Sequence, residues 1–552
     1  MSVREQFLIL RIIMLQVLVF VSGMTVLGCE LTASRLLAPY FGTSLFIWAN
    51  VIGLILLYLT AGYWLGGLLS DRVPVRAALY HVCAVAAIFI GVVPYLAKPI
   101  LYFSSLGFAS VSLGMFWGSL LGVVGLFLIP LTLLGCVSPW TVRLAVVDVA
   151  GAGKTAGRLY AISTLGSLVG AYLPVLFLIP TVGTDRTFVL LSALLLITSL
   201  VGLAQERRAG ITGEGPWVVP IRDWTPRLFV AYIVCLAAIL GMGVLPRGIV
   251  RAQPYGQLLW EGESAYNYIQ VVKQGTRTDL VLNEGHAIHS IYDPTAFLTG
   301  GPWDYFMVAP YFSPATAMKD VDSFLLLGSA AGTTPRQMTQ VYGPIPIDGV
   351  EIDPGIIDVG RQYFGMTMPN LTAIPQDGRY FLRNTPKRYR MIGVDAYRQP
   401  YIPFHMVTRE FFTEIREHLK PGGVAVINVG RTQTDYRLVN VLASTMRDVY
   451  PTVFVINIPK AINSIVVGTR EPGSLDAFRA NIAALDRPEL REVGALASAT
   501  MCEYVAPGQT SVSGGEPCAF AKSLPRQVFT DDLAPVEQVV DQILLGYIQE
   551  HN

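Results

Sequence analysis

The first half of the chain alternates between long uncharged runs and short charged loops. The uncharged runs cover residues 12–29, 45–69, 78–97, 101–137, 159–182, 188–204 and 228–245. Most of them are close to the roughly 20 residues with which an α-helix crosses a bilayer. The pattern therefore predicts a multi-pass helical membrane bundle of about seven helices over residues 1–250, with the lipid bilayer as its partner.

The fourth of these runs, residues 101–137, is too long for one span and short for two. It is either one helix preceded by a segment on the membrane surface or a tight hairpin. The choice matters because an odd number of spans places the two ends of the bundle on opposite sides of the membrane.

After residue 250 the long apolar runs give way to short segments. Residues 266–272, 278–283 and 287–292 predict a small antiparallel sheet within residues 251–310. Over residues 311–552, short apolar runs alternate with amphipathic segments, as in an open α/β sheet. The predicted organisation is a helical membrane bundle, a small β-segment and an α/β domain.

The α/β part contains a strand, a turn of small residues and a second strand that ends in an acid. The apolar run 323–327 precedes the turn from Gly328 to Gly332, and Glu351 ends the next strand. Small residues let the backbone approach a ligand closely, and an acid about twenty residues further on holds the ribose hydroxyls in Rossmann-type sheets. The segment predicts a nucleoside-binding half-site in a Rossmann-like domain.

Two further acids follow at the ends of later predicted strands. Asp377, followed by Gly378, ends one of them, and Asp395 closes the apolar run that begins at residue 391. The carboxyl ends of strands form the ligand-binding edge of an open α/β sheet. We therefore expect Glu351, Asp377 and Asp395 to lie at this edge.

Several motifs of this region resemble the spermidine synthase (polyamine aminopropyltransferase) family, whose members use a methyltransferase-like Rossmann sheet. The motifs are GSAAGTTPRQ, VEIDP, QDGRYFL, VDAYRQP and TREFF followed by LKPGGV, and the resemblance covers roughly residues 266–429. It implies that Glu351 holds the ribose, Asp377 and Gly378 the adenine, and Asp395 the amine that is alkylated.

The resemblance also assigns residues before the large sheet. Tyr266-Asn267-Tyr-Ile is similar to a YQxI segment of the family, which implies a contact from Asn267 to the sulfonium end of the donor. Tyr305 stands where the family has a Tyr-His-Glu run and is implied as a hydrogen-bond partner of the nucleophile. The alternative for Tyr305 is packing in the core.

Two departures from the family pattern concern charge. The family carries an Asp where this chain has Ala331, and the second Asp of its DxxD segment is replaced by Arg398. Those carboxylates would hold cationic amines of the donor and the acceptor. The nucleoside half of the site is therefore expected to be kept and the polyamine half to be altered.

The resemblance implies a membrane-anchored transferase. It would move an aminopropyl group from decarboxylated S-adenosylmethionine to an amine, either a small molecule or a membrane-tethered group. One alternative is an S-adenosylmethionine-dependent methyl or aminocarboxypropyl transferase with a membrane-associated acceptor, in which Arg398 meets a carboxylate. Another is a non-catalytic transport or sensor protein that binds a nucleoside or a polyamine. A homodimer is left open.

Composition and histidine spacing limit the other partners. A net charge of +1 gives no support for nucleic acid, and a mean hydropathy of +0.49 is too apolar for a soluble enzyme. His286, His289 and His405 are not joined by a cysteine or acid at a recognisable ligand spacing. No metal site is expected.

Loop charges and cysteines bear on the side of the membrane. With seven spans, most Lys and Arg residues of the loops share a side with the N-terminus, which the positive-inside rule places in the cytoplasm. Cys502 and Cys518 enclose a loop rich in Gly, Pro and Ser, and they are either a disulfide or two free thiols. We predict a cell-membrane protein with an extracytoplasmic second half, which conflicts with a nucleoside donor made in the cytosol.

Overall fold

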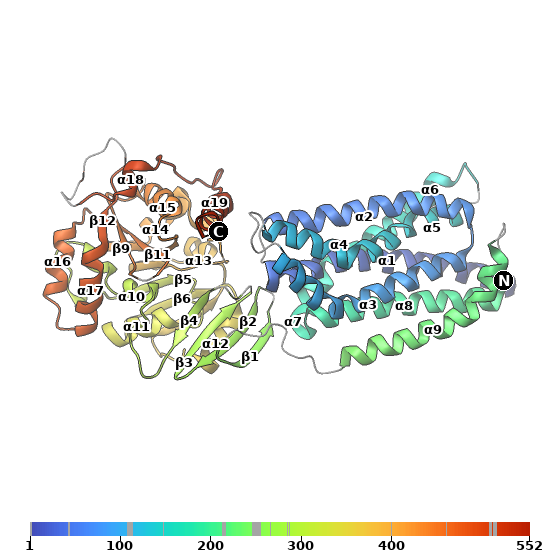
Figure 1. Ribbon diagram of the computed structural model, residues 1–552, viewed down its shortest axis with the longest axis horizontal. Coiled ribbons are helices and arrows are strands. Elements are labelled where there is room, and N and C mark those ends of the chain that lie inside the picture. The colour runs from blue at the N-terminus through green and yellow to red at the C-terminus, as the bar shows by residue number, and fades with distance from the viewer. Residues whose placement is uncertain are drawn as a thin grey trace. The chain divides into compact units, whose positions relative to one another are not determined.

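A computed structural model describes two compact units, Met1–Ala252 and Gln253–Asn552 (Figure 1). Each unit has its own hydrophobic core. The described residues are 3–41, 45–107, 114–146, 148–211, 217–244, 255–264, 266–283, 285, 287–398, 400–459, 461–506, 511 and 516–551.

The first unit is helical throughout its described residues. Its elements are α1 (Val3–Phe41), α2 (Leu45–Arg72), α3 (Arg76–Gly107), α4 (Gly114–Gly135), α5 (Val137–Ala145), α6 (Ala152–Leu173), the π-helical turn η1 (Pro174–Leu178), α7 (Ile179–Val182), α8 (Thr184–Ala209) and α9 (Val218–Val244). In the described part of the chain, seven segments are long and apolar enough to cross a membrane: Ile9–Ala38, Ile47–Arg72, Arg76–Ser104, Phe116–Ala145, Ala152–Val182, Thr184–Ala209 and Val218–Val244. The predicted bundle of about seven helices is confirmed.

The uncharged run over residues 101–137 contributes to two helices. Its first residues continue α3 as far as Gly107, and its residues 116–137 belong to the span Phe116–Ala145. Residues 108–113 of the run lie outside the described residues. The described residues of the run therefore belong to the end of α3 and to one further span.

Glycine allows α1 and α6 to contact each other through their backbones. A Cβ at Gly166 would lie 2.0 Å from the carbonyl oxygen of Phe20, and one at Gly170 would lie 2.2 Å from that of Met24. Neither distance leaves room for a side chain, so only glycine permits this approach. The small residues of α6 thus serve helix packing.

The second unit begins with a four-stranded antiparallel sheet in the order β1-β2-β3-β4. Its strands are β1 (Gln257–Glu263), β2 (Tyr268–Gln274), β3 (Arg277–Leu282) and β4 (Ile288–Tyr292). The three predicted segments correspond to β2, β3 and β4, whereas β1 was not predicted.

The second unit continues with an eight-stranded sheet in the order β12-β10-β11-β9-β8-β5-β6-β7. Strands β5 to β9 are parallel, and β10 to β12 pair antiparallel. The strands are β5 (Phe324–Leu327), β6 (Ile347–Glu351), β7 (Leu371–Pro375), β8 (Tyr389–Val394), β9 (Leu419–Gly430), β10 (Thr452–Asn457), β11 (Asn463–Thr469) and β12 (Met501–Glu503). This confirms the predicted Rossmann-like α/β domain with a small β-segment before it.

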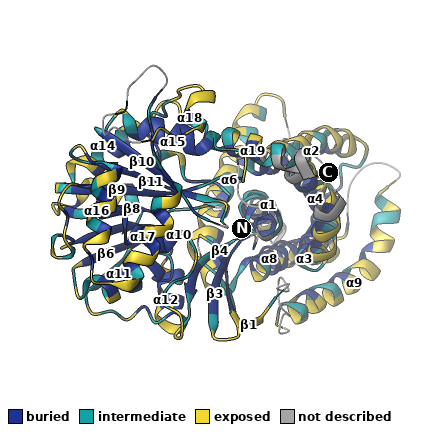
Figure 2. Ribbon diagram, turned by 60° about the vertical axis from the view of Figure 1, so that its left-hand side comes forward, coloured by how far each residue is buried: buried dark blue, intermediate teal, exposed yellow. Residues whose placement is uncertain are grey.

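Helices cover the large sheet on both faces. They are α10 (Pro302–Phe306), η2 (Ala309–Phe312), η3 (Met318–Asp320), α11 (Thr333–Tyr342), α12 (Pro354–Tyr363), α13 (Gly378–Asn384), η4 (Phe404–Met406), α14 (Arg409–Glu417), α15 (Arg437–Arg447), α16 (Leu475–Ala483), α17 (Pro488–Thr500), α18 (Phe520–Ser523) and α19 (Val536–His551). In β5, Leu325 and Leu327 join one apolar cluster, and Phe324 and Leu326 join the other. The strands are therefore buried on both sides (Figure 2), as parallel strands usually are.

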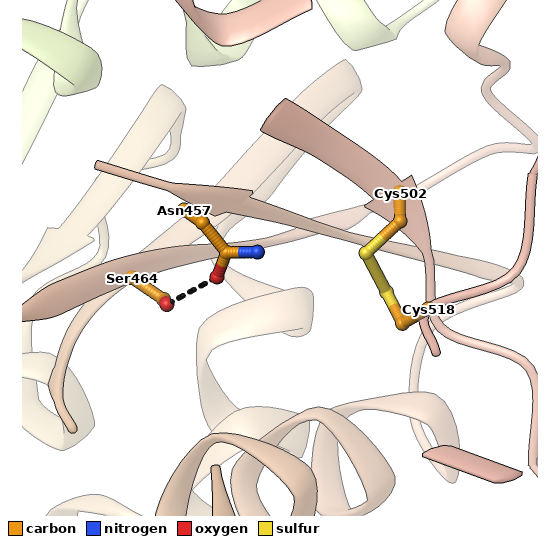
Figure 3. The surroundings of a disulfide bond; sticks show 4 residues. All are labelled: Asn457, Ser464, Cys502 and Cys518. Atoms are coloured by element: carbon orange, nitrogen blue, oxygen red, sulfur yellow. Dashed lines mark hydrogen bonds between the residues drawn. A yellow bond between two sulfur atoms is a disulfide. The ribbon is translucent and has the colours of Figure 1, made fainter. Parts of the chain in front are cut away.

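A disulfide joins β12 to the loop that follows it. Cys502 and Cys518 are bonded, with their Cα atoms 5.0 Å apart (Figure 3). Nearby, the Ser464 hydroxyl of β11 donates to Asn457 Oδ1 of β10 at 2.7 Å. Of the two alternatives for these cysteines, the structure contains the disulfide.

Candidate functional site

The strand order reverses beside β5, which lies between β6 and β8. In open α/β sheets, ligands bind outside the carboxyl ends of the strands at such a point. The turn after β5 begins at Gly328. Glu351 is the last residue of β6, Asp377 follows β7 and Asp395 follows β8. The three acids singled out from the sequence therefore lie at the carboxyl edge of the sheet.

Backbone hydrogen bonds hold three strand ends together at Gly328. The amides of Gly328 and Ser329 donate to the carbonyl of Val350 at 2.9 and 3.0 Å, and the amide of Asp395 donates to the carbonyl of Leu327 at 2.8 Å. Gly328 has φ +88°, and a Cβ there would lie 2.5 Å from the Asp395 carbonyl oxygen. Only glycine fits this turn, which brings the end of β6 and the end of β8 close to each other.

Glu351 is buried at the end of β6 and bound by two backbone amides. Ala330 donates to Oε2 at 2.9 Å and Asp353 donates to Oε1 at 3.1 Å. Burial raises the pKa of Glu351 to about 7, and these amides oppose the shift. Each carboxylate oxygen retains a lone pair for a further donor. The pair of oxygens is therefore suited to two neighbouring hydroxyl groups, such as those of a ribose.

The small sheet packs on the turn through its edge strand β4. Ala331 donates its backbone amide to the Ser290 hydroxyl at 3.0 Å, and the Thr333 hydroxyl bonds the backbone of Ile291. Gly332, with φ +90°, is the N-cap of α11. Ala331 is buried, so the position at which the family carries an acid here presents only a methyl group.

Asp377 caps the helix α13 and faces a histidine. Its Oδ1 accepts the backbone amide of Tyr380 at 2.9 Å, and its Oδ2 lies 3.3 Å from Nε2 of His405. The His405 contact lowers the pKa of Asp377. A Cβ at Gly378 would lie 3.0 Å from Cε of Met406 and 3.3 Å from Cβ of Leu327, so a larger residue would crowd this end of β5.

Asp395 follows β8 and receives hydrogen bonds from two other elements. Asn428 of β9 donates from Nδ2 to Oδ1 at 2.9 Å, and the Trp303 indole of α10 also bonds the carboxylate. Burial raises the pKa of Asp395 to about 6, while both donors oppose the shift. The sequence analysis did not identify Asn428 or Trp303. A polar residue inside the apolar run 424–429 was the available signal for Asn428.

Asn267 and Tyr305 occupy different surroundings. Asn267 donates from Nδ2 to Asp353 Oδ2 at 2.8 Å, which places it beside the end of β6. Tyr305 is 3% exposed and belongs to the apolar cluster beneath the large sheet, where burial raises its pKa to about 12. Its helix reaches Asp395 through Trp303, two residues earlier. This arrangement agrees with the packing alternative for Tyr305.

Arg398 lies on the loop that follows Asp395. Its backbone amide donates to the Tyr401 carbonyl at 2.8 Å, and the Tyr401 amide donates to the Arg398 carbonyl at 3.0 Å. The Arg398 residue is exposed. A cation therefore stands on the loop beside the residue predicted to hold the acceptor.

Among the described residues, no group of three or more His, Cys, Asp or Glu could hold a metal ion. His286 lies outside those residues. A cavity of about 400 Å³ opens in the small sheet, and none of its lining residues is a predicted site residue; they are Tyr255, Gln274, Asp279, Gly285, Ala287 and Ile288.

The fold and the strand-end acids define an α/β domain with a candidate nucleoside site. Residues 313–473 match the family model described as "Spermine/spermidine synthase domain". This part of the chain is therefore similar to spermidine synthase domains, in agreement with the resemblance indicated by its motifs.

Two relatives named for aminopropyl transfer match part of this chain. A "Probable polyamine aminopropyl transferase" of Bifidobacterium longum (strain NCC 2705) is 33% identical over 299 residues, which is 52% of this chain and 64% of the relative. A "Polyamine aminopropyltransferase" of Vibrio vulnificus (strain CMCP6) is 28% identical over 150 residues, 26% of this chain and 49% of the relative. The chain thus spans less than two thirds of the length of each of these two relatives, 64% and 49%.

Among solved structures, a probable spermidine synthase from Corynebacterium glutamicum ATCC 13032 is 20% identical, with a TM-score of 0.35. The match covers 47% of this chain and 100% of that one.

Proposed function

We propose that the protein is a membrane-anchored, spermidine synthase-like transferase. It moves an aminopropyl group from decarboxylated S-adenosylmethionine to an amine acceptor. The observation that carries the proposal is the turn at Gly328, which brings together the ends of β6 and β8. The acid at the end of β6, Glu351, is buried, and the acid that follows β8, Asp395, is partly buried. Glu351 has two oxygens suited to a ribose, and Asp395 has a carboxylate suited to an amine.

The reaction needs little from the protein beyond placement. The acceptor nitrogen attacks the aminopropyl carbon next to the sulfonium, a C–N bond forms and the C–S bond breaks. Methylthioadenosine leaves with the electron pair of the broken bond. Asp395 in its anionic form accepts a hydrogen bond from the nitrogen and takes up the proton that the product amine releases. Glu351 holds the nucleoside in line for the attack.

The comparisons support this reaction class. The matched domain family and the relatives from Bifidobacterium longum and Vibrio vulnificus carry names of aminopropyl transfer. Buried Ala331 and exposed Arg398 bear on the acceptor, because neither supplies a carboxylate for a second cationic amine. We therefore propose an acceptor that presents one amine, either a small molecule or a membrane-tethered group.

Arg398 favours one alternative donor. A guanidinium on the loop that follows Asp395 could bind the carboxylate of intact S-adenosylmethionine, which decarboxylated S-adenosylmethionine lacks. The reaction would then be a methyl or aminocarboxypropyl transfer. A sensor would bind the nucleoside without turnover.

We propose in addition that the second unit lies outside the cytoplasm. Seven spans and the charge of the loops support this side, given a cytoplasmic N-terminus. The disulfide between Cys502 and Cys518 is also typical of an oxidising compartment.

The test uses the purified full-length protein in detergent or nanodiscs. It is titrated with decarboxylated S-adenosylmethionine, S-adenosylmethionine and methylthioadenosine, and amine-dependent product release is measured. We expect methylthioadenosine from the decarboxylated donor. S-adenosylhomocysteine would indicate methyl transfer, and binding without any product would indicate a sensor.

Matched variants separate the roles of the two acids. Asp395→Asn should reduce transfer about 100-fold or more while methylthioadenosine still binds. Glu351→Gln should weaken binding of donor and methylthioadenosine together. Asp358→Asn, which changes an acid of α12 that is 76% exposed, should leave both unchanged.

A further inference from the structure

Asp395 is held from two sides by uncharged donors that belong to separate elements. Asn428 of β9 donates to Oδ1 at 2.9 Å, and the Trp303 indole of α10 donates to the same carboxylate. A carboxylate has about four acceptor positions, so two donors leave room for an acceptor nitrogen.

Asn463 determines which way the Asn428 amide faces. Asn463 of β11 donates from Nδ2 to Asn428 Oδ1 at 3.0 Å. Because the oxygen of Asn428 accepts this bond, its NH₂ group is directed at Asp395. A flipped amide would place oxygen against oxygen at Asp395 and NH₂ against NH₂ at Asn463.

The loop after Asp395 is fastened to the same end of β9. The Tyr397 hydroxyl donates to the backbone carbonyl of Asn428 at 3.0 Å and accepts the backbone amide of Gly430 at 2.7 Å. Residues 395 and 397 therefore both contact β9, one through a carboxylate and one through a hydroxyl. This double attachment opposes rotation of Asp395 away from the sheet edge.

We propose that Asn428 is the positioning residue of Asp395, with Trp303 as a second donor and Asn463 as the residue that orients Asn428. The inference rests on the proposed function, which assigns Asp395 to the acceptor amine. Hydrogen bonds from uncharged donors stabilise the anionic carboxylate, which is the form that accepts from the amine.

The electrostatic surroundings of Asp395 agree with this role. Burial raises its pKa to about 6, and the bonds from Asn428 and Trp303 act in the opposite direction. In the part of the chain that the structure describes, Tyr397 is the titratable group whose pKa is raised by Asp395 as well as by burial, so its phenol stays neutral. Loss of a donor should therefore raise the pKa of Asp395.

The experiment follows kcat/KM for the acceptor against pH in the full-length protein. Activity should fall as pH drops through the pKa of Asp395. Asn428→Leu removes the donor at similar volume. We expect the acidic limb of the pH profile, where kcat/KM falls, to move to higher pH by about 1 pH unit, which corresponds to the loss of one hydrogen bond to a charged group. Trp303→Phe should move it in the same direction, and Asn463→Leu by less. KM for the donor should stay unchanged.

Asn481→Leu is the matched control for a structural role. Asn481 also donates two hydrogen bonds, to the carbonyls of Tyr311 and Ser313 at 2.8 and 2.9 Å, but it lies outside the site. It should lower Tm without moving the acidic limb. Asn428→Leu and Trp303→Phe variants that lower the rate equally at every pH, as a purely structural change would, overturn the inference.

A second readout separates this inference from the proposed function. The carboxyl stretch of Asp395 can be titrated by infrared difference spectroscopy, with Asp395→Asn as the subtraction. If no aminopropyl transfer is found, the proposed function fails, yet an upward shift of this titration in Asn428→Leu still supports positioning. An unchanged titration in both Asn428→Leu and Trp303→Phe rejects it.

Discussion

Glu351 couples the pH of the solution to the stability of the fold. Its pKa rises from 4.5 to about 7 because the carboxyl is buried. Between these values the folded chain keeps a proton that the unfolded chain has lost, so stability should fall as pH rises. Glu351→Gln should remove this contribution, about 3 kcal/mol across the window. The measurement is the difference in unfolding free energy between wild type and variant at about pH 4.5 and about pH 7.5.

The control for this prediction is Asp358→Asn, whose carboxylate is exposed. It should retain the pH dependence of the wild type. Parallel curves for wild type and Glu351→Gln would contradict the coupling. A nucleoside that donates two hydroxyls to Glu351 favours the anion, so its binding should tighten as pH rises through about 7.

His405 contacts Asp377, so its role can be tested by measuring nucleoside binding. The contact between His405 Nε2 and Asp377 Oδ2 is 3.3 Å, and both side chains are about one third exposed. His405→Ala should weaken methylthioadenosine binding by at most about tenfold, since one partly exposed contact is lost. Titration calorimetry measures the change.

His418→Ala is the matched control for His405. His418 also contacts two groups of the protein, the backbone carbonyls of Glu414 and Thr385. Neither of these is a predicted site residue. Its replacement should leave the dissociation constant unchanged. Equal losses in both variants would show that the effect is not specific to Asp377.

At the scale of elements, the turn at Gly328 should be intolerant of any side chain. Gly328→Ala places a Cβ 2.5 Å from the Asp395 carbonyl in a backbone with φ +88°. We expect a loss of roughly 1–3 kcal/mol in stability and a displaced Asp395, with a larger loss of transfer than of nucleoside binding. Thermal unfolding and steady-state kinetics measure the two effects.

Gly343→Ala separates backbone strain from collision. Gly343 ends α11 with φ +78°, and a Cβ there meets nothing within 4 Å. It should cost about 1 kcal/mol and leave the kinetics intact. Similar kinetic losses in the two variants would contradict the role given to the Gly328 contact.

The strand-end acids could be predicted from the sequence because they follow local patterns. Glu351 and Asp395 each end or follow an apolar strand, and parallel strands bring their carboxyl ends to one edge. Trp303 could not be found in this way, since it reaches Asp395 from a segment about ninety residues earlier. Tyr305 was predicted to contact the nucleophile from its position in the motif. Which side chains of α10 face the site depends on tertiary packing, and Tyr305 packs in an apolar cluster.

The bundle shows the same division between local and tertiary information. Run lengths predicted seven spans, but the end of α3 at Gly107 lies within an uncharged run that extends to residue 137. Hydrophobicity alone cannot mark that end, because both helices are apolar on either side of it. Strand β1 was missed since it has no clear alternation of apolar and polar residues.

For the whole molecule, the decisive question is which side of the membrane holds the second unit, because it determines which donor and acceptor pools the site can meet. Single cysteines at two exposed positions test the proposed side. Val149→Cys lies between α5 and α6, and Asp476→Cys lies on α16, where the side chains are 93% and 90% exposed. Seven spans with a cytoplasmic N-terminus place the first inside and the second outside.

In intact cells, a membrane-impermeant maleimide should label Asp476→Cys at once and Val149→Cys only after lysis. The wild type provides the background from Cys29, Cys83 and Cys136, which are buried, and from Cys235. The reverse labelling would place the domain in the cytoplasm, beside the pool in which sulfonium nucleosides are made. An outside location instead requires that both the donor and the acceptor reach the outer surface of the membrane. The labelling result therefore decides on which side of the membrane the substrates of the site are found.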